Sequence, residues 1–218
     1  MLKNRLVPLS GIVFVALILA SVFTINPPGS NASASTVLTY YQVHHNATSA
    51  SALLTGLGVI FGVLFFGYLR EYLRQDRATR WLASTAFGGV LLFAAGGAIS
   101  AGALLALGDQ PHVLDAAAAQ TLNLVQSDVS GSFTQAGLAV FYLATAAAIL
   151  RGRRLPAWLG WVSLVLGVLA ASLVLSFIAF LATGLWVIVV AIMLWIRATR
   201  EGAEQESAPR RQEYAEHA

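Results

Sequence analysis

The sequence contains no cysteine and very little charge. Of its 218 residues, 57% are hydrophobic and only 11% are Asp, Glu, Lys or Arg, whereas soluble domains carry about 25% charged residues. The absence of cysteine excludes disulfides, thiolate metal sites, cysteine nucleophiles and iron–sulfur clusters. The shortage of charge excludes a soluble enzyme, a nucleic-acid-binding domain and a disordered chain. We therefore predict a membrane protein and expect no nucleic-acid partner.

The hydrophobic residues form blocks long enough to cross a lipid bilayer. A hydrocarbon core of ~30 Å requires about 20 apolar residues in a helix. The last block, residues 156–196, would be roughly 60 Å long as one helix, so we divide it near residues 175–177. The sequence thus predicts an all-α fold, a polytopic transmembrane helical bundle surrounded by bilayer lipid. Its six spans are expected at residues 8–25, 52–69, 81–107, 133–150, 156–175 and 178–196.

All 13 Lys and Arg residues fall in alternate connections between these spans or at the chain ends beside them. They are Lys3, Arg5, Arg70, Arg74, Arg77, Arg80, Arg151, Arg153, Arg154, Arg197, Arg200, Arg210 and Arg211. Because basic residues accumulate in cytoplasmic loops, we predict that residues 1–7 and the charged tail 197–218 are both cytoplasmic. The tail is too polar to bury a core, so we predict that it is disordered, with a frayed helix as the alternative. The excess of arginine over lysine and the abundant alanine indicate a bacterium with a high-GC genome, and hence its plasma membrane.

The first span has a second interpretation, as a signal peptide. Lys3 and Arg5 precede it, and Ala32-Ser33-Ala34 resembles a signal-peptidase site. The stretch between the span and this site is long for a signal peptide and contains two prolines. We therefore expect a retained span, with cleavage as the alternative; the remaining topology is the same in both cases.

None of the six predicted spans contains Asp, Glu, Lys, Arg or His. Ion-coupled transporters, proton pumps and voltage sensors generally keep ionisable groups at membrane depth. Retinal proteins need a buried lysine, and membrane haem proteins usually need buried histidines. We therefore predict no cofactor and favour a protein that is not an enzyme.

Small residues recur at four-residue spacing in the second and third spans. Gly58 and Gly62 form a GxxxG pair, and Gly96 precedes Ser100 by four residues. Such pairs let helix backbones approach closely in lipid. One interpretation is packing within the chain. The other is a homodimer or a membrane-protein partner that binds through these residues.

The connection between the third and fourth spans carries acids and no bases. Leu114, Ala118, Leu122 and Val125 recur in it at helical spacing, which predicts a short amphipathic helix on the membrane surface. Asp109 is placed to cap this helix, with Pro111 in its first turn. Ser132 and Gln135 have the spacing of a capping box at the start of the fourth span.

Histidine and aspartate gather on the side opposite to the arginines. Asp109, His112 and Asp115 are three residues apart, and His44 and His45 lie in the preceding connection on the same side. Neutral imidazoles and carboxylates are ordinary ligands of zinc and similar divalent metals. These five residues are therefore candidate metal ligands; in the alternative, the aspartates stabilise a helix and the histidines are solvated.

The stretch from Arg151 to Gly167 joins an arginine-rich loop to Leu-Pro-Ala-Trp-Leu-Gly-Trp and the fifth span. It resembles the corresponding stretch of small multi-pass membrane proteins of unknown function from actinobacteria, and the similarity extends over residues 52–197. The resemblance implies a multi-pass membrane protein. That family has no assigned activity, so no functional residue is carried over from it.

Three functions are compatible with these features. The first is a non-enzymatic structural or accessory subunit, which is favoured by spans without ionisable residues and by small-residue packing. The second is a carrier or binder of a neutral lipophilic small molecule, which predicts a ligand-sized cavity between helices lined by Gly, Ser and Thr. The third is a metal-binding protein of the outer face. We expect the first.

Overall fold

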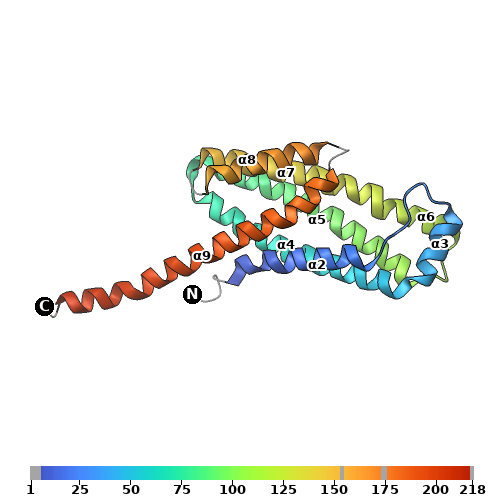
Figure 1. The fold of residues 1–218 in the computed structure, drawn as a ribbon, viewed down its shortest axis with the longest axis horizontal. Helices are drawn as coiled ribbons and strands as arrows, with labels where there is room; N and C mark the ends of the chain where they lie inside the picture. Colours follow the sequence, from blue (N-terminus) through green and yellow to red (C-terminus); the bar gives the residue numbers. More distant parts are fainter. Residues whose placement is uncertain (1–5, 153–154, 173–175, 217–218) are drawn as a thin grey trace.

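The computed structural model describes residues 6–152, 155–172 and 176–216, with side chains except at 176–178 and 201–216, and all regular elements in this part are helical. Most helices run along one axis of an elongated bundle (Figure 1). The elements are the short turn η1 (Val7–Leu9), α2 (Ser10–Thr24), α3 (Ala34–Val43), α4 (His45–Arg74), η2 (Arg77–Thr79), α5 (Arg80–Asp109), α6 (Ala116–Leu124), the π-helical segment η3 (Val125–Val129), α7 (Ser130–Arg151), α8 (Ala157–Ala171) and α9 (Ser176–Glu216).

Five helical segments of the described chain are long and apolar enough to cross a membrane. They are Val7–Thr24, His45–Arg74, Arg77–Asp109, Ala116–Arg151 and Ala179–Arg200, and each overlaps a predicted span. The span predicted at 156–175 corresponds to α8, which is only 15 residues long. It ends there because Ser172 leaves the helical conformation and its Oγ donates to the Leu169 carbonyl at 2.8 Å. We predicted the turn to the last span near residues 175–177, whereas α9 already begins at Ser176. Residues 173–175 lie outside the described residues.

Glycines set the closest helix contacts. A Cβ atom on Gly89 of α5 would lie 2.5 Å from the Phe141 nitrogen of α7, and one on Gly137 of α7 would lie 2.4 Å from the Phe93 nitrogen of α5. The two backbones therefore touch, as small residues allow. Other glycines of α4 and α5 also face helices of the same chain: a Cβ on Gly58, Gly62 or Gly96 would meet Ile18, Phe14 or Thr134. Packing within the chain accounts for these three residues, and a homodimer or partner interface through them stays a prediction.

Aromatic side chains fill the centre of the bundle. The rings of Phe141, Tyr142 and Trp186 pack edge to face at centroid distances of 4.9 to 5.5 Å. Such pairs stabilise a core beyond the burial of their area alone. The indole Nε1 of Trp186 donates to Ser163 Oγ at 3.1 Å, so this core contact also ties α9 to α8.

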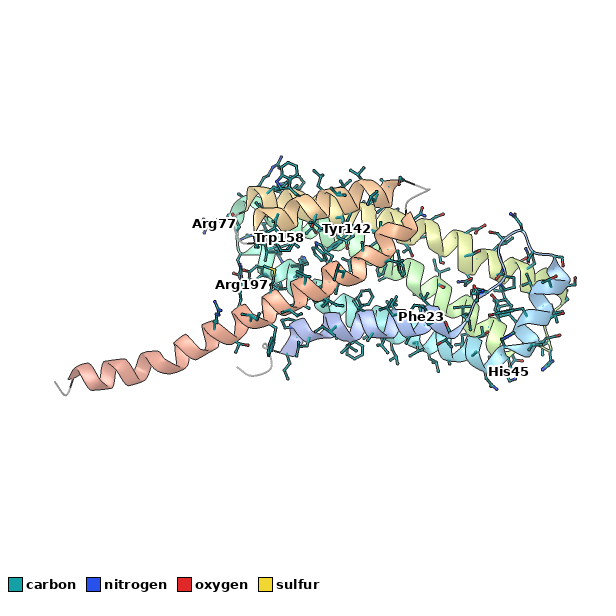
Figure 2. All side chains as sticks on the ribbon, viewed as in Figure 1. Phe23, His45, Arg77, Tyr142, Trp158 and Arg197 are labelled. Atoms are coloured by element: carbon teal, nitrogen blue, oxygen red, sulfur yellow. The ribbon has the colours of Figure 1, made fainter. Side chains whose placement is uncertain are left out.

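The two ends of the bundle differ in chemistry. Arg77 and Arg197 lie at one end and His45 lies at the other (Figure 2). We call the first the basic end; there Glu71 forms ion pairs with Arg70 and Arg74, both at 3.1 Å. Lys3, Arg5, Arg153 and Arg154 lie outside the described residues. Beyond the basic end, α9 projects away from the bundle (Figure 1) and continues to Glu216, whereas the sequence predicts a disordered tail there.

The opposite end is covered by a polar cap, which consists of α3, the connection 25–33, α6 and η3. The short helix expected in this region forms as α6, but its cap is Asp115 and not Asp109: the Asp115 carboxylate accepts from the Ala118 N–H at 2.7 Å. Asp109 is the last residue of α5. The predicted capping box at Ser132 is also wrong, because η3 runs directly into α7 and the Ser132 hydroxyl donates to the Asp128 carbonyl at 2.8 Å.

Candidate ligand-binding cavity

A cavity of about 590 Å³ lies between the polar cap and the aromatic core. Its walls come from α2, α4, α5, η3, α7 and the first turns of α9. The lining residues are Ile18, Ser21, Val22, Ile25, Asn26, Pro27, Ser51, Thr55, Val59, Phe93, Gly96, Gly97, Ser100, Leu104, Gln126, Ser127, Ser130, Thr134 and Phe180. Pockets that hold small molecules have volumes in this range.

The cavity exists because α8 is short and α9 is oblique. α8 ends at Ala171, and α9 starts near it and crosses the bundle towards η1 and the beginning of α2 (Figure 1). On the polar-cap side of this crossing, α2 and α7 diverge with α5 behind them (Figure 1). The space between them is the cavity, and Phe180 of α9 closes its end near the crossing.

Small residues form the floor on α5. A Cβ atom on Gly96 would lie 2.7 Å from the Ser130 carbonyl oxygen, and one on Gly97 would lie 2.6 Å from Val59 Cγ2. α5 therefore lies so close to α4 and α7 that larger side chains do not fit at these positions. Ser100, one turn further along, lines the open space.

Hydroxyl groups form one wall. Ser21 Oγ lies 2.8 Å from Ser51 Oγ and 2.7 Å from Thr55 Oγ1, and Ser51 Oγ lies 3.2 Å from the Ser21 carbonyl oxygen. These three hydroxyls bond largely to one another. Ser100 of α5 and Thr134 of α7 add two further hydroxyl-bearing residues to the lining.

The connection 25–33 forms the roof of the cavity and is held by α3 and α6 of the polar cap. Asn123 of α6 is fully buried; its Oδ1 accepts from the Tyr41 hydroxyl at 2.7 Å and its Nδ2 donates to the Pro28 carbonyl at 3.2 Å. The Asn26 N–H donates to the Tyr40 hydroxyl at 2.9 Å. Burial, and secondarily the neighbouring Tyr40, raises the pKa of Tyr41 well above its ordinary value, which keeps its hydroxyl protonated as a donor.

Gln126 is a further polar residue of the lining. It lies in η3, where the backbone forms a π-helical turn, and its Oε1 atom is buried without a hydrogen-bond partner among the described residues. Buried polar atoms are normally paired, so each unpaired one needs an explanation. π-Helical turns are rare and frequently occur at functional sites.

The opposite end of the cavity is apolar. A smaller space of about 30 Å³ adjoins it between α2 and α9 and shares Ile18, Phe93 and Phe180 with the main cavity. None of the described residues that line either space is charged. The arrangement thus suits a neutral molecule with a polar end at the roof and an apolar body at the aromatic core.

The five predicted metal ligands have other surroundings. His44 stacks on Tyr40 at a centroid distance of 4.4 Å, and Asp115 caps α6. His45 starts α4, Asp109 ends α5, and His112 lies in the turn before α6. In the described part of the chain, no group of three or more His, Asp or Glu side chains is placed to hold a metal ion. The metal-binding hypothesis therefore gains no support from the fold.

No protein-family model, curated protein or solved structure matches this chain. The resemblance to actinobacterial membrane proteins stays a prediction, and the functional argument rests on the cavity itself.

Proposed function

We propose that this protein is a multi-pass protein of a bacterial plasma membrane that binds a neutral amphipathic small molecule in the cavity between α2 and α7. The observation that carries the proposal is the uncharged cavity of about 590 Å³ with a hydroxyl-lined wall and an apolar end. This is the second of the three functions compatible with the sequence. A polar wall opposite an apolar end is the arrangement by which a binding site orients an amphipathic molecule, whereas a purely structural bundle gains nothing from it. A bound molecule therefore accounts for the lining better than a structural role does.

Six spans with both termini in the cytoplasm fit this proposal. Arg77, before α5, and Arg197, in α9, lie at the same end of the bundle (Figure 2), as positive-inside bias requires. Between them the chain passes along α5, α7, α8 and α9. Four passes return it to the same end, so α8 would be a short fifth span and α9 the sixth. With this placement, the space between α2 and α7 faces the lipid, and a lipophilic ligand can enter from the bilayer.

Native mass spectrometry of protein extracted in polymer-bounded discs of its own membrane tests the proposal. Ser100→Phe places a ring in the cavity from α5. Gly102→Phe is the matched control, because Gly102 is on the same helix, is exposed and has open space around its Cβ position. We expect a small-molecule mass on the wild-type protein and on Gly102→Phe, and a bare chain for Ser100→Phe. An identical bound mass on Ser100→Phe, or a bare chain in all three samples, would contradict the proposal.

A further inference from the structure

The basic end concentrates arginines where α4 passes into α5. Residues 70–80 contain four arginines and only two acids. Two of the arginines share one carboxylate, because Glu71 Oε1 lies 3.1 Å from Nη1 of both Arg70 and Arg74. The Asp76 carboxylate is the N-cap of η2 and accepts from a backbone N–H at 3.0 Å. This part of the bundle therefore carries an excess of positive charge.

A contact between α4 and α5 places these arginines along the seam between the two helices. A Cβ atom on Gly67 of α4 would lie 3.9 Å from the Phe87 ring of α5, so these residues face each other. Residues seven positions apart lie on the same face of a helix. Arg74 follows Gly67 by seven residues, and Arg80 precedes Phe87 by seven. Since α4 and α5 run in opposite directions (Figure 1), Arg74 and Arg80 flank the same seam, two turns nearer to the basic end.

Arg70 extends along the seam towards the middle of the bundle. Its guanidinium Cζ lies 5.4 Å from the centroid of the Phe87 ring, a cation–π contact. Side chains of a helix lean towards its N-terminus, and α4 begins at His45, at the polar-cap end (Figure 2). The side chains of Arg70 and Arg74 are 31% and 34% exposed, so both can contact a further ligand. The shared carboxylate neutralises only one of these two charges.

Beyond Arg70 the seam becomes apolar. Leu64 of α4 and Leu91 of α5 are exposed, and each lies about one turn further towards the polar cap than the contact between Gly67 and Phe87. At the other end of the seam, the exposed Trp81 follows Arg80. Exposed tryptophans typically lie at the level of the lipid headgroups. The seam thus offers positive charge at headgroup level and an apolar surface below it.

We propose that the seam between α4 and α5 binds an anionic phospholipid of the surrounding bilayer, whose phosphate lies against Arg70, Arg74 and Arg80. An acyl chain of the same lipid lies along Leu64 and Leu91. Arginine binds phosphate through paired, charge-assisted hydrogen bonds. A zwitterionic lipid carries its own cation and would be held less tightly. This site requires the membrane placement proposed above but not an occupied cavity.

A competition between two lipids tests the site. The full chain is reconstituted in nanodiscs that contain dioleoyl phosphatidylglycerol and dioleoyl phosphatidylcholine at equal mole fractions. Native mass spectrometry then measures the ratio of the two lipids retained on the protein. A basic residue beside an anionic lipid surface favours binding roughly fivefold. With three arginines at the phosphate, we expect the wild-type protein to prefer phosphatidylglycerol by at least about tenfold.

Variants that change one charge each locate the site. Arg70→Gln and Arg80→Gln should each lower the preference roughly fivefold. Arg200→Gln is the matched control and should keep the wild-type preference, because Arg200 is exposed on α9, which packs against α2, η1 and α8. Glu71→Gln should raise the preference, because both arginines that share this carboxylate become available to the phosphate. A folding defect cannot produce such a gain.

The following results would overturn the assignment. Equal retention of the two lipids by the wild-type protein would show that the seam does not select an anionic lipid. Equal losses in Arg70→Gln and Arg200→Gln would show attraction by net charge alone, and a preference that does not rise in Glu71→Gln would show that the shared carboxylate does not compete with a phosphate. An excess of inorganic phosphate should leave the lipid in place; its displacement would show a site for a free phosphate ion. The cavity is tested separately by Ser100→Phe, so either proposal can fail without the other.

Discussion

The roof of the cavity depends on one buried side chain, Asn123, and replacing it should loosen the polar cap. Asn123→Leu keeps a similar volume and removes both hydrogen bonds, so the Tyr41 hydroxyl and the Pro28 carbonyl lose their partners. Tyr41 is only 1% exposed, so water does not replace the lost acceptor. Val37 and Tyr41 of the cap belong to a hydrophobic cluster that is separate from the main core and also includes residues of α4 and α5. The cap can therefore open locally without disrupting the main core.

The expected loss of stability follows from the two groups that lose their hydrogen-bond partners, the Tyr41 hydroxyl and the Pro28 carbonyl. At about 1–3 kcal/mol for each unpaired buried group, Asn123→Leu should destabilise the closed cap by about 3 kcal/mol. Tyr41→Phe leaves only the Asn123 Oδ1 atom without a partner and should destabilise the closed cap by about 1–2 kcal/mol. The double variant leaves only the Pro28 carbonyl unpaired, so its cost should fall short of the sum by about 1–3 kcal/mol.

Hydrogen exchange of α3 in nanodiscs measures this opening. A cost of about 3 kcal/mol corresponds to roughly 100-fold faster exchange of the protected α3 amides, with exchange in α5 unchanged. The reasoning is refuted if α3 exchanges at the wild-type rate in Asn123→Leu. Additive effects in the double variant would equally show that the bond between Tyr41 and Asn123 does not hold the cap.

Three further predictions concern packing and pH. Gly137→Ala should lower stability in an SDS unfolding titration by about 1–3 kcal/mol, because the added Cβ meets the α5 backbone. Gly102→Ala should leave stability unchanged, because there is open space around the Gly102 Cβ position. Equal losses of stability in the two variants would contradict this prediction. Since burial raises the pKa of Tyr41, the contribution of Tyr41 to stability should be constant below about pH 10 and fall as the pH rises further, because Tyr41 ionises first in the unfolded chain. An alkaline titration of Tyr41→Phe should show a smaller fall, and an unchanged curve would argue against it. Trp186→Phe removes core packing and the hydrogen bond to Ser163 of α8, so it should lower the free energy of unfolding by about 2 kcal/mol in the same SDS titration. Trp161→Phe should lower it much less, because Trp161 is 59% exposed. Similar losses in the two variants would show that Trp186 does not contribute to the core.

The positions of the apolar helices could be predicted, because the length of a hydrophobic run determines whether it can cross a bilayer. The expected span 81–107 closely matches α5, which covers Arg80–Asp109. The expected span 52–69 is shorter than α4, which begins at His45 and ends at Arg74. A helix continues past its apolar part wherever polar residues keep its backbone bonds, so hydropathy locates the centre of a helix better than its ends.

The polar cap was predicted only in part, although some of its signals are present in the sequence. Ser33 caps α3 by accepting from the Thr36 N–H at 3.2 Å, and Val37 and Tyr41 follow at helical spacing. This pattern could have revealed α3. The bonds of Asn123 to Tyr41 and Pro28 join residues that are far apart in the chain, and local periodicity cannot reveal them.

The cavity could not be predicted in position. The Gly, Ser and Thr of the spans predicted only what would line a cavity if one formed. Its location depends on where α8 ends and on the oblique path of α9, which are set by tertiary packing. The π-helical turn at η3 likewise has no signature in the sequence, so Gln126 was not among the predicted site residues.

The shortness of α8 also affects the surrounding lipid in the proposed placement. At 15 residues, α8 is ~22 Å long, several ångströms less than the ~30 Å hydrocarbon thickness of a bilayer. Such a mismatch is relieved when the bilayer thins beside the short helix, at a modest cost per ångström. Headgroups and water would then lie deeper at the end of α8, close to the side of the bundle where α2 and α7 diverge. An amphipathic molecule bound as proposed would approach the cavity from this depression with its polar end still hydrated, so the membrane itself would lower the barrier to entry.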